Sequence, residues 1–321
     1  MNRLGQAADS FEPRGIPLAL ARSLLAFAQL TTILLAPDRI LFVDSHEAGA
    51  GAPCAGLRRA ALWCATNGEA RPGGPGSVIA IAVLLVVIVG YRPRWSCVAH
   101  YYVAFSIAVE VTATNGGDNV AEILTMLLIP LCLDDRRSWA WREPARPLRP
   151  AWRGSAFAAH AVLRCQVAII YLTAAVSKLT FPAWRRGTAL GILIHDPEFS
   201  APEPLRPLLQ HLLAHPWAMD LLTWSVLATE TLIALSMAFG RRTRSYGLVL
   251  AVLLHGAIIL LMGLFSFGLI MIALVLTACA DRPAIRSADD HDRRENHHRD
   301  LGKEGRHEPG DSALRAGARL A

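Results

Sequence analysis

The sequence predicts an all-α protein, a polytopic bundle of about eight transmembrane helices with both termini in the cytoplasm. Of its 321 residues, 53% are hydrophobic and only 18% are charged, and the mean hydropathy is +0.34. Several apolar runs reach the length of roughly 20 residues that crosses a hydrocarbon core of roughly 30 Å. This composition argues against a pair of soluble domains, although the chain is long enough for two.

Eight apolar runs are expected to span the membrane. The first contains Arg22 and is too long for the core of a signal peptide, so we expect it to remain as a span. The last two runs are nearly continuous and together too long for one helix, and Gly263 and Ser266 mark the expected turn. In chain order the expected spans are 16–36, 77–90, 96–114, 119–133, 155–178, 217–239, 245–262 and 264–280.

The distribution of arginine predicts the orientation. With residues 1–15 as a cytoplasmic N-terminus, the inner loops at 90–95, 134–154 and 240–244 hold two, six and three arginines. The short outer loop at 115–118 holds none, as the positive-inside rule requires. The net charge of +6 therefore indicates orientation and contact with anionic lipids of a cell membrane, not nucleic-acid binding.

The segment 281–321 is highly charged and cannot bury enough apolar surface to fold, so we expect a disordered cytoplasmic tail. His291, His297 and His298 lie in it. A solvated tail explains these histidines more simply than metal binding, and we predict no metal site.

Cys54 and Cys64 lie ten residues apart in the first outer loop, where the environment permits oxidation. Three interpretations remain open for this disulfide candidate: a structural crosslink, a redox-active pair that exchanges with a partner peptide, or no bond.

The fourth span is short. With Asp118 or Asn119 as N-cap and Glu122 in the first turn, it reaches Leu133 after about 15 residues, or roughly 22 Å. The Asn115-Gly-Gly-Asp118 loop should then lie below the outer surface, where irregular backbone requires protein cover or a water-filled cavity. This favours an outward-facing pocket, although a capped turn built with glycine is a compatible alternative.

The outer loop 179–216 leads into a segment, Leu205 to Trp217, whose apolar spacing suits a short helix lying in the membrane interface. It either covers the pocket as a lid or fills a surface between spans.

Three ionisable residues are expected inside the bilayer. Counted from the inner ends of their spans, Arg164, Glu230 and His255 all lie about 13–15 Å deep. Such residues usually face the bundle interior and often serve function, so an Arg164–Glu230–His255 layer forms if the three helices adjoin. The alternative is a polar clasp that only stabilises the bundle.

Lys178 ends the fifth span in a chain with thirty arginines and one other lysine, Lys303 in the tail. Unlike arginine, lysine can lose its proton when it is desolvated. The simpler interpretation is a lysine that extends to the interface beside Trp184.

A second group of polar residues lies near the outer boundary. Glu110, Asn115 and Asp118 are expected at a depth similar to that of Lys178. A lysine near a carboxylate and an amide in a partly dry pocket is suited to proton transfer.

Three motifs occur along residues 16–280. The first in the chain is Asn115-Gly-Gly-Asp118, before a run ending Leu133-Asp134-Asp135-Arg136, and the second is Tyr171-x-x-Ala174-x-x-x-Lys178-Leu179, with Trp184 and Gly187 after it. The third is Glu230 followed by His255 in HGAIILLMGLFSFGLIMIA. They resemble the horizontally transferred transmembrane (HTTM) family, which includes vitamin K-dependent γ-carboxylases. The third motif looks most like the bacterial B component of sporulation-delaying peptide maturation.

In the carboxylases, the lysine that matches Lys178 is the base that deprotonates reduced vitamin K. This chain lacks their large lumenal domain, which argues against glutamate carboxylation. The resemblance implies maturation or modification of a small secreted peptide precursor at the extracytoplasmic face, and a quinone-like lipid is compatible with it. The expected catalytic residues are Lys178, Glu230 and His255, and the expected substrate-binding residues are Asn115, Asp118, Glu110, Trp184 and Arg164.

The alternative is a non-enzymatic transporter, immunity or scaffold protein, and the sequence leaves open whether the protein is an enzyme. No cofactor is identified.

Overall fold

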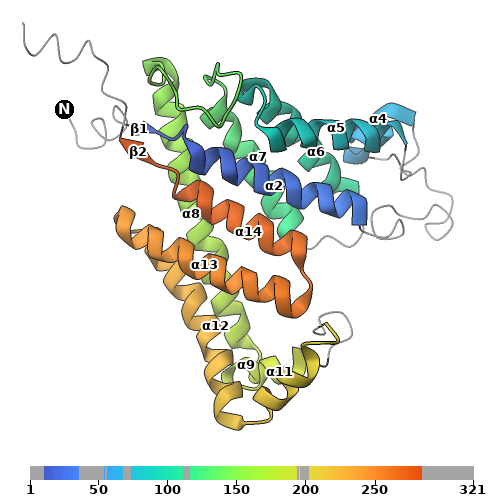
Figure 1. The fold of residues 1–321 in the computed structure, drawn as a ribbon, viewed down its shortest axis with the longest axis vertical. Coiled ribbons are helices and arrows are strands. Elements are labelled where there is room, and N and C mark those ends of the chain that lie inside the picture. The colour runs from blue at the N-terminus through green and yellow to red at the C-terminus, as the bar shows by residue number, and fades with distance from the viewer. Residues whose placement is uncertain are drawn as a thin grey trace, which may run out of the picture. The chain divides into compact units, whose positions relative to one another are not determined.

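The computed structural model describes residues 11–35, 54, 56–67, 74–110, 116–193, 195 and 202–283. Most of these residues are helical and very few are in strands, which confirms the predicted fold class (Figure 1). The strands among them are β1 (Phe11–Glu12) and β2 (Arg282–Pro283), which pair antiparallel with Phe11 opposite Pro283. The pair joins the two ends of the described chain.

Each predicted apolar run coincides with a helix. Several of these helices begin with proline, whose missing N–H is not needed in a first turn. The long helices are α2 (Ile16–Leu35), α5 (Pro75–Val89), α6 (Pro93–Glu110), α7 (Gly116–Cys132), α8 (Pro150–Thr180), α12 (Pro216–Ser236), α13 (Arg241–Met262) and α14 (Phe265–Ala278). The short ones are η1 (Gly56–Ala60), α4 (Leu62–Asn67), α9 (Pro182–Arg185), α10 (Ala189–Leu193) and α11 (Arg206–Leu213).

Among the described helices, α2, α8, α12 and α13 are long and apolar enough to cross a membrane, and α5 and α14 are shorter apolar helices. These lengths and compositions indicate an integral membrane protein. The number of eight spans remains a prediction.

The core lies where α14 packs against α2, α7 and α13, and α8 against α7, α12 and α14 (Figure 1). Small residues such as Ala121 and Ala273 are fully buried there beside large ones such as Leu124 and Leu274. Small side chains let membrane helices approach closely, so that packing stabilises the bundle where lipid offers no hydrophobic driving force.

The polar contacts sort the loops into two groups. Segments predicted to be cytoplasmic contact one another: Ala140 N donates to Gly90 O at 2.8 Å, and Arg14 Nη2 donates to Arg146 O at 2.7 Å. The predicted outer ends of the first and last spans also meet, as where the hydroxyls of Thr32 and Ser266 lie 2.7 Å apart. This sorting fits the predicted topology, and which group faces the cytoplasm stays a prediction.

The Leu133-Asp134-Asp135-Arg136 motif holds the loop after α7 in shape. Asp134 accepts hydrogen bonds from the backbone N–H and the Nε of Arg149, at 2.9 and 2.6 Å. Asp135 accepts two from the guanidinium of Arg137, at 2.8 and 2.6 Å. Both carboxylates are buried, so the acidic half of this motif is structural.

Two predictions about helix ends need correction. The turn between α13 and α14 lies at Gly263, whose φ of 68° suits glycine after a helix, whereas Ser266 already belongs to α14. Asp281 to Pro283 do not start a disordered tail, because β2 pairs with β1 and Asp281 pairs with Arg164 and Arg244. The rest of the tail, with His291, His297 and His298, lies outside the described residues.

Candidate functional site

The centre of the candidate site is an ion pair between α8 and α12. Lys178 Nζ lies 2.6 Å from Glu230 Oε1, and the two side chains are 26% and 10% exposed. The ring centroid of Trp184 on α9 lies 5.5 Å from the same nitrogen. An ammonium over an indole face is attracted by the ring quadrupole, so Trp184 also favours the charged lysine.

A second polar pair lies on the same face of α8. Tyr171 precedes Lys178 by seven residues, or two helical turns, and is 2% exposed. Its hydroxyl lies 2.7 Å from Nε2 of His255 on α13, and that ring contacts Phe267 on α14, with centroids 5.6 Å apart. One face of α8 therefore holds polar partners from both α12 and α13.

Two polar atoms of the site keep hydrogen-bonding capacity. Within the described part of the chain, neither Glu230 Oε2 nor His255 Nδ1 has a hydrogen-bond partner. Tyr171 and Lys178 lie on one face of α8, two helical turns apart, so the two polar pairs are neighbours along that helix. The four side chains thus form one cluster, the Lys178–Glu230–Tyr171–His255 cluster, which can hold and move a proton.

The chain between α8 and α10 explains the glycine of the motif. α8 ends at Thr180, Pro182 starts α9, and Gly187 has a φ of 74°. A Cβ atom at Gly187 would overlap the side chain and the Cα atom of Asp220 on α12. Glycine suits this close approach, which holds the turn between α9 and α10 against α12.

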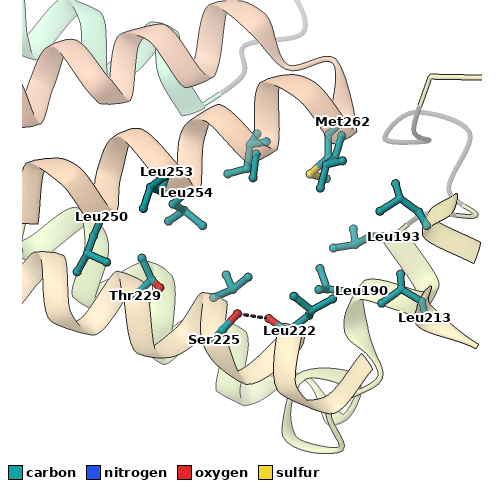
Figure 2. A pocket seen from close by; sticks show the side chains of 15 residues that line it. Leu190, Leu193, Leu213, Leu222, Ser225, Thr229, Leu250, Leu253, Leu254 and Met262 are labelled. Carbon is teal, nitrogen blue, oxygen red and sulfur yellow. Dashed lines mark hydrogen bonds between the residues drawn. The ribbon is translucent and has the colours of Figure 1, made fainter. Parts of the chain in front are cut away.

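An apolar cavity of about 320 Å³ lies beside the cluster, between α12, α13 and the short helices α10 and α11 (Figure 2). Thr229 and Leu254 line it, and each immediately precedes a cluster residue, Glu230 or His255. The cavity therefore occupies a neighbouring face of the same two helices. Lys178 is not among its lining residues.

The predicted interfacial helix is confirmed in part. It spans Arg206–Leu213, shorter than expected, because Pro216 starts α12 and places Trp217 in that helix. Leu209 and Leu213 of α11 line the cavity, and Leu213 is labelled in Figure 2, so α11 covers this hollow.

The predicted layer is wrong for Arg164. Its guanidinium donates to Ala278 O at 3.2 Å and to Asp281 Oδ2 at 2.6 Å, and Arg244 donates to the same carboxylate oxygen at 2.5 Å. Lys178 lies fourteen residues further along α8, or about 21 Å. Depth counting failed because the two helix starts are offset: Asp281 pairs with Arg164, in the fourth or fifth turn of α8, and with Arg244, in the first or second turn of α13.

The predicted Asn115-Gly-Gly-Asp loop also needs correction. α7 begins at Gly116, so Asp118 is not an N-cap but a buried residue of the first turn, where a carboxylate complements the helix dipole. Glu122 accordingly lies in the second turn. Asn115 and the side chain of Glu110 lie outside the described residues, so their place in the site is untested.

Cys54 and Cys64 form a disulfide, with Cα atoms 5.6 Å apart. The bond joins the segment before η1 to α4, and Arg58 Nε between them donates to Val109 O at 3.0 Å. The crosslinked loop is therefore held against the end of α6.

Sequence reasoning missed the part that Tyr171 takes in the site. It treated Tyr171 as a motif position only, yet its hydroxyl is the partner of His255. The seven-residue spacing to Lys178 was the available signal, since it places both side chains on one face of a helix.

Comparison with known proteins supports the resemblance seen in the motifs. A family model described as the HTTM domain matches residues 77–281. Sporulation-delaying protein SdpB of Bacillus subtilis (strain 168) is 31% identical over 277 residues, which cover 86% of this chain and 84% of that protein. Uncharacterized protein YitO of the same strain is 27% identical over 258 residues, covering 80% and 82%. No solved structure matches the chain.

Proposed function

Because the chain belongs to the HTTM domain family, we propose that it is a multi-pass cell-membrane protein that matures or modifies a small exported peptide. The similarity to sporulation-delaying protein SdpB supports this choice of substrate class. The observation that carries the proposal is the ion pair of Lys178 with Glu230 at 2.6 Å, next to the Tyr171–His255 pair. We place the reaction at the extracytoplasmic face, where the predicted topology puts the end of α8.

The cluster is suited to acid and base catalysis. Transfer of a proton from Lys178 Nζ to Glu230 Oε1 leaves a neutral amine that can accept a proton from a substrate. Glu230 Oε2 and His255 Nδ1, which have no partner in the described residues, can orient polar groups of that substrate. A compact amine is needed for this role, because a guanidinium does not give up its proton.

The apolar cavity supplies a binding surface for the same substrate. Its lining is almost entirely leucine and other aliphatic side chains, which suit the apolar segment of a short peptide (Figure 2). The hydrocarbon tail of a quinone-like lipid would also fit this lining. Since Lys178 does not line the cavity, no step of the reaction is assigned to such a group.

Mass spectrometry of the exported peptide tests the proposal. The protein is expressed together with a short candidate precursor that carries a signal peptide and cysteines, and the wild type is compared with Lys178→Ala and Lys178→Arg. We expect both variants to leave the peptide unprocessed or unmodified, while Arg185→Ala, an exposed change on α9, leaves the peptide mass as in the wild type. Normal peptide in Lys178→Ala cells removes the catalytic role of Lys178.

One observation favours the non-enzymatic alternative. The Lys178–Glu230 and Tyr171–His255 contacts join α8 to α12 and α13, as a structural clasp would. If this were their whole role, Lys178→Arg would keep full activity because a fixed charge would suffice. Glu230→Gln would then lower only the amount of folded protein, with activity per folded molecule unchanged.

A further inference from the structure

A cationic cavity lies at the other end of the bundle, away from the proposed catalytic cluster. It has a volume of about 380 Å³ and is formed by the turn between α5 and α6 and the loop after α7. Its lining includes four arginines, Arg92, Arg94, Arg136 and Arg137.

Most of this positive charge has no protein counter-ion. Arg137 pairs with Asp135 at 2.6 Å. In the described ranges of the chain, no carboxylate lies within salt-bridge distance of Arg92, Arg94 or Arg136. Guanidinium groups match the geometry of phosphate oxygens, so three such groups around one hollow suit a phosphate ligand.

Hydrogen bonds to the backbone fix the walls of the cavity. Arg92 N donates to Ser138 O at 2.9 Å, and Trp141 Nε1 donates to Val89 O at 2.9 Å. A Cβ atom at Gly90 would come within 2.8 Å of the Trp141 ring, so only glycine permits this approach. Arg92 itself has a φ of 41°, which a side-chain-bearing residue rarely adopts. The cavity is therefore preorganised, which reduces the entropic cost of binding.

Aromatic side chains surround the cavity as they do at a membrane surface. Trp95 lines it, is 63% exposed, and lies with its ring 5.1 Å from the Arg94 guanidinium. Tyr91 and Trp139 form an exposed ring pair on the two loops. Tryptophan and tyrosine favour the depth of lipid headgroups. The exposed apolar side chain of Val89, at the end of α5, is available to contact an acyl chain.

We propose that this cavity binds the phosphate of an anionic phospholipid from the leaflet that borders these loops. The unpaired arginines bind the headgroup, and the aromatic side chains with the end of α5 contact the glycerol and acyl region. The exposed indole and the apolar helix end favour a lipid over free phosphate.

Native mass spectrometry of the full chain in mild detergent tests the proposal, with phosphatidylglycerol or phosphatidylcholine as the added lipid. We expect Arg94→Gln/Arg136→Gln to bind phosphatidylglycerol about 25-fold more weakly, because each arginine near a lipid surface contributes about fivefold. The matched control is Arg241→Gln/Arg242→Gln, which removes two exposed arginines from the segment at the start of α13 and should bind as the wild type does.

Arg92→Gly separates binding from folding, because glycine adopts the backbone of Arg92 without strain. We expect this variant to keep its thermal midpoint and to bind phosphatidylglycerol about fivefold more weakly, because it removes one arginine. The proposal is overturned if both double variants weaken binding equally, if phosphatidylcholine binds as tightly, or if inorganic phosphate displaces the lipid at equal concentration.

Discussion

The hydroxyl of Tyr171 lies 2.7 Å from Nε2 of His255, two helical turns along α8 from Lys178. Both side chains are buried, at 2% and 3% exposure. Since His255 Nδ1 has no partner in the described residues, this hydrogen bond is the contact that fixes the orientation of the imidazole.

Tyr171→Phe removes that hydrogen bond without changing the packing of the ring. We expect the free energy of unfolding to fall by about 1–2 kcal/mol, because a buried imidazole nitrogen is left unpaired. Thermal unfolding in detergent measures the loss. Tyr246→Phe is the control, since Tyr246 on α13 is 71% exposed, and an equal change in both variants would contradict the expectation.

The Lys178–Glu230 pair should show strong coupling in a double-mutant cycle. Either Lys178→Met or Glu230→Leu alone leaves a half-buried charge without its partner, so each destabilises the protein. The two together replace the pair by apolar side chains, which is often close to neutral. We expect a coupling free energy of about 1–3 kcal/mol in equilibrium unfolding. Additive effects would show that the pair contributes little to stability.

Gly187→Ala should destabilise the outer segment. The added Cβ overlaps Asp220, and the φ of 74° strains any side-chain-bearing residue. Overpacking of this kind costs about 1–3 kcal/mol. In Gly256→Ala the new methyl group meets open space, so that variant should unfold at or above the wild-type temperature. If both variants unfold alike, the approach to Asp220 is not a constraint.

Cysteine labelling tests the predicted orientation of the chain in the membrane. With an impermeant maleimide on intact cells, we expect a chain whose only cysteines are Cys54 and Cys64 to react after reduction of its disulfide. In a cysteine-free chain, Ala145→Cys, in the exposed loop after α7, should react only after the cells are opened. The reverse pattern would invert the predicted topology and place the Lys178 cluster on the cytoplasmic side.

The helices were predictable because each is a continuous apolar run ended by proline, glycine or charge. The turn at Gly263 follows from the same local signals, whereas the spacing of Cys54 and Cys64 left open whether they are bonded. The position of Arg164 was not predictable, because its partner Asp281 lies 117 residues away and beyond the last apolar run. Counting residues from the start of each helix cannot locate such a contact, because α8 and α13 do not start at the same level.

The sequence predicted which residues belong to the candidate site better than it predicted which of them contact one another. Lys178, Glu230 and His255 were expected from their rarity in apolar runs, and all three belong to the cluster. Sequence reasoning assigned Lys178 to an outer group with Asp118, whereas its partner in the structure is Glu230. The rotation of each helix about its own axis decides which side chains meet. In a membrane helix with weak amphipathicity the sequence does not determine this rotation.

The first long helix, α2, and the last, α14, are direct neighbours, and β1 pairs with β2 just outside them. During synthesis α2 therefore enters the bilayer long before α14, one of the helices that it packs against, has left the ribosome. Its buried polar side chains find partners earlier, because Arg22 donates to Ser96 and Gln29 contacts His100, both on α6. The bundle can finish assembling only after translation has passed residue 283. Insertion of α14 is therefore the step that completes the fold.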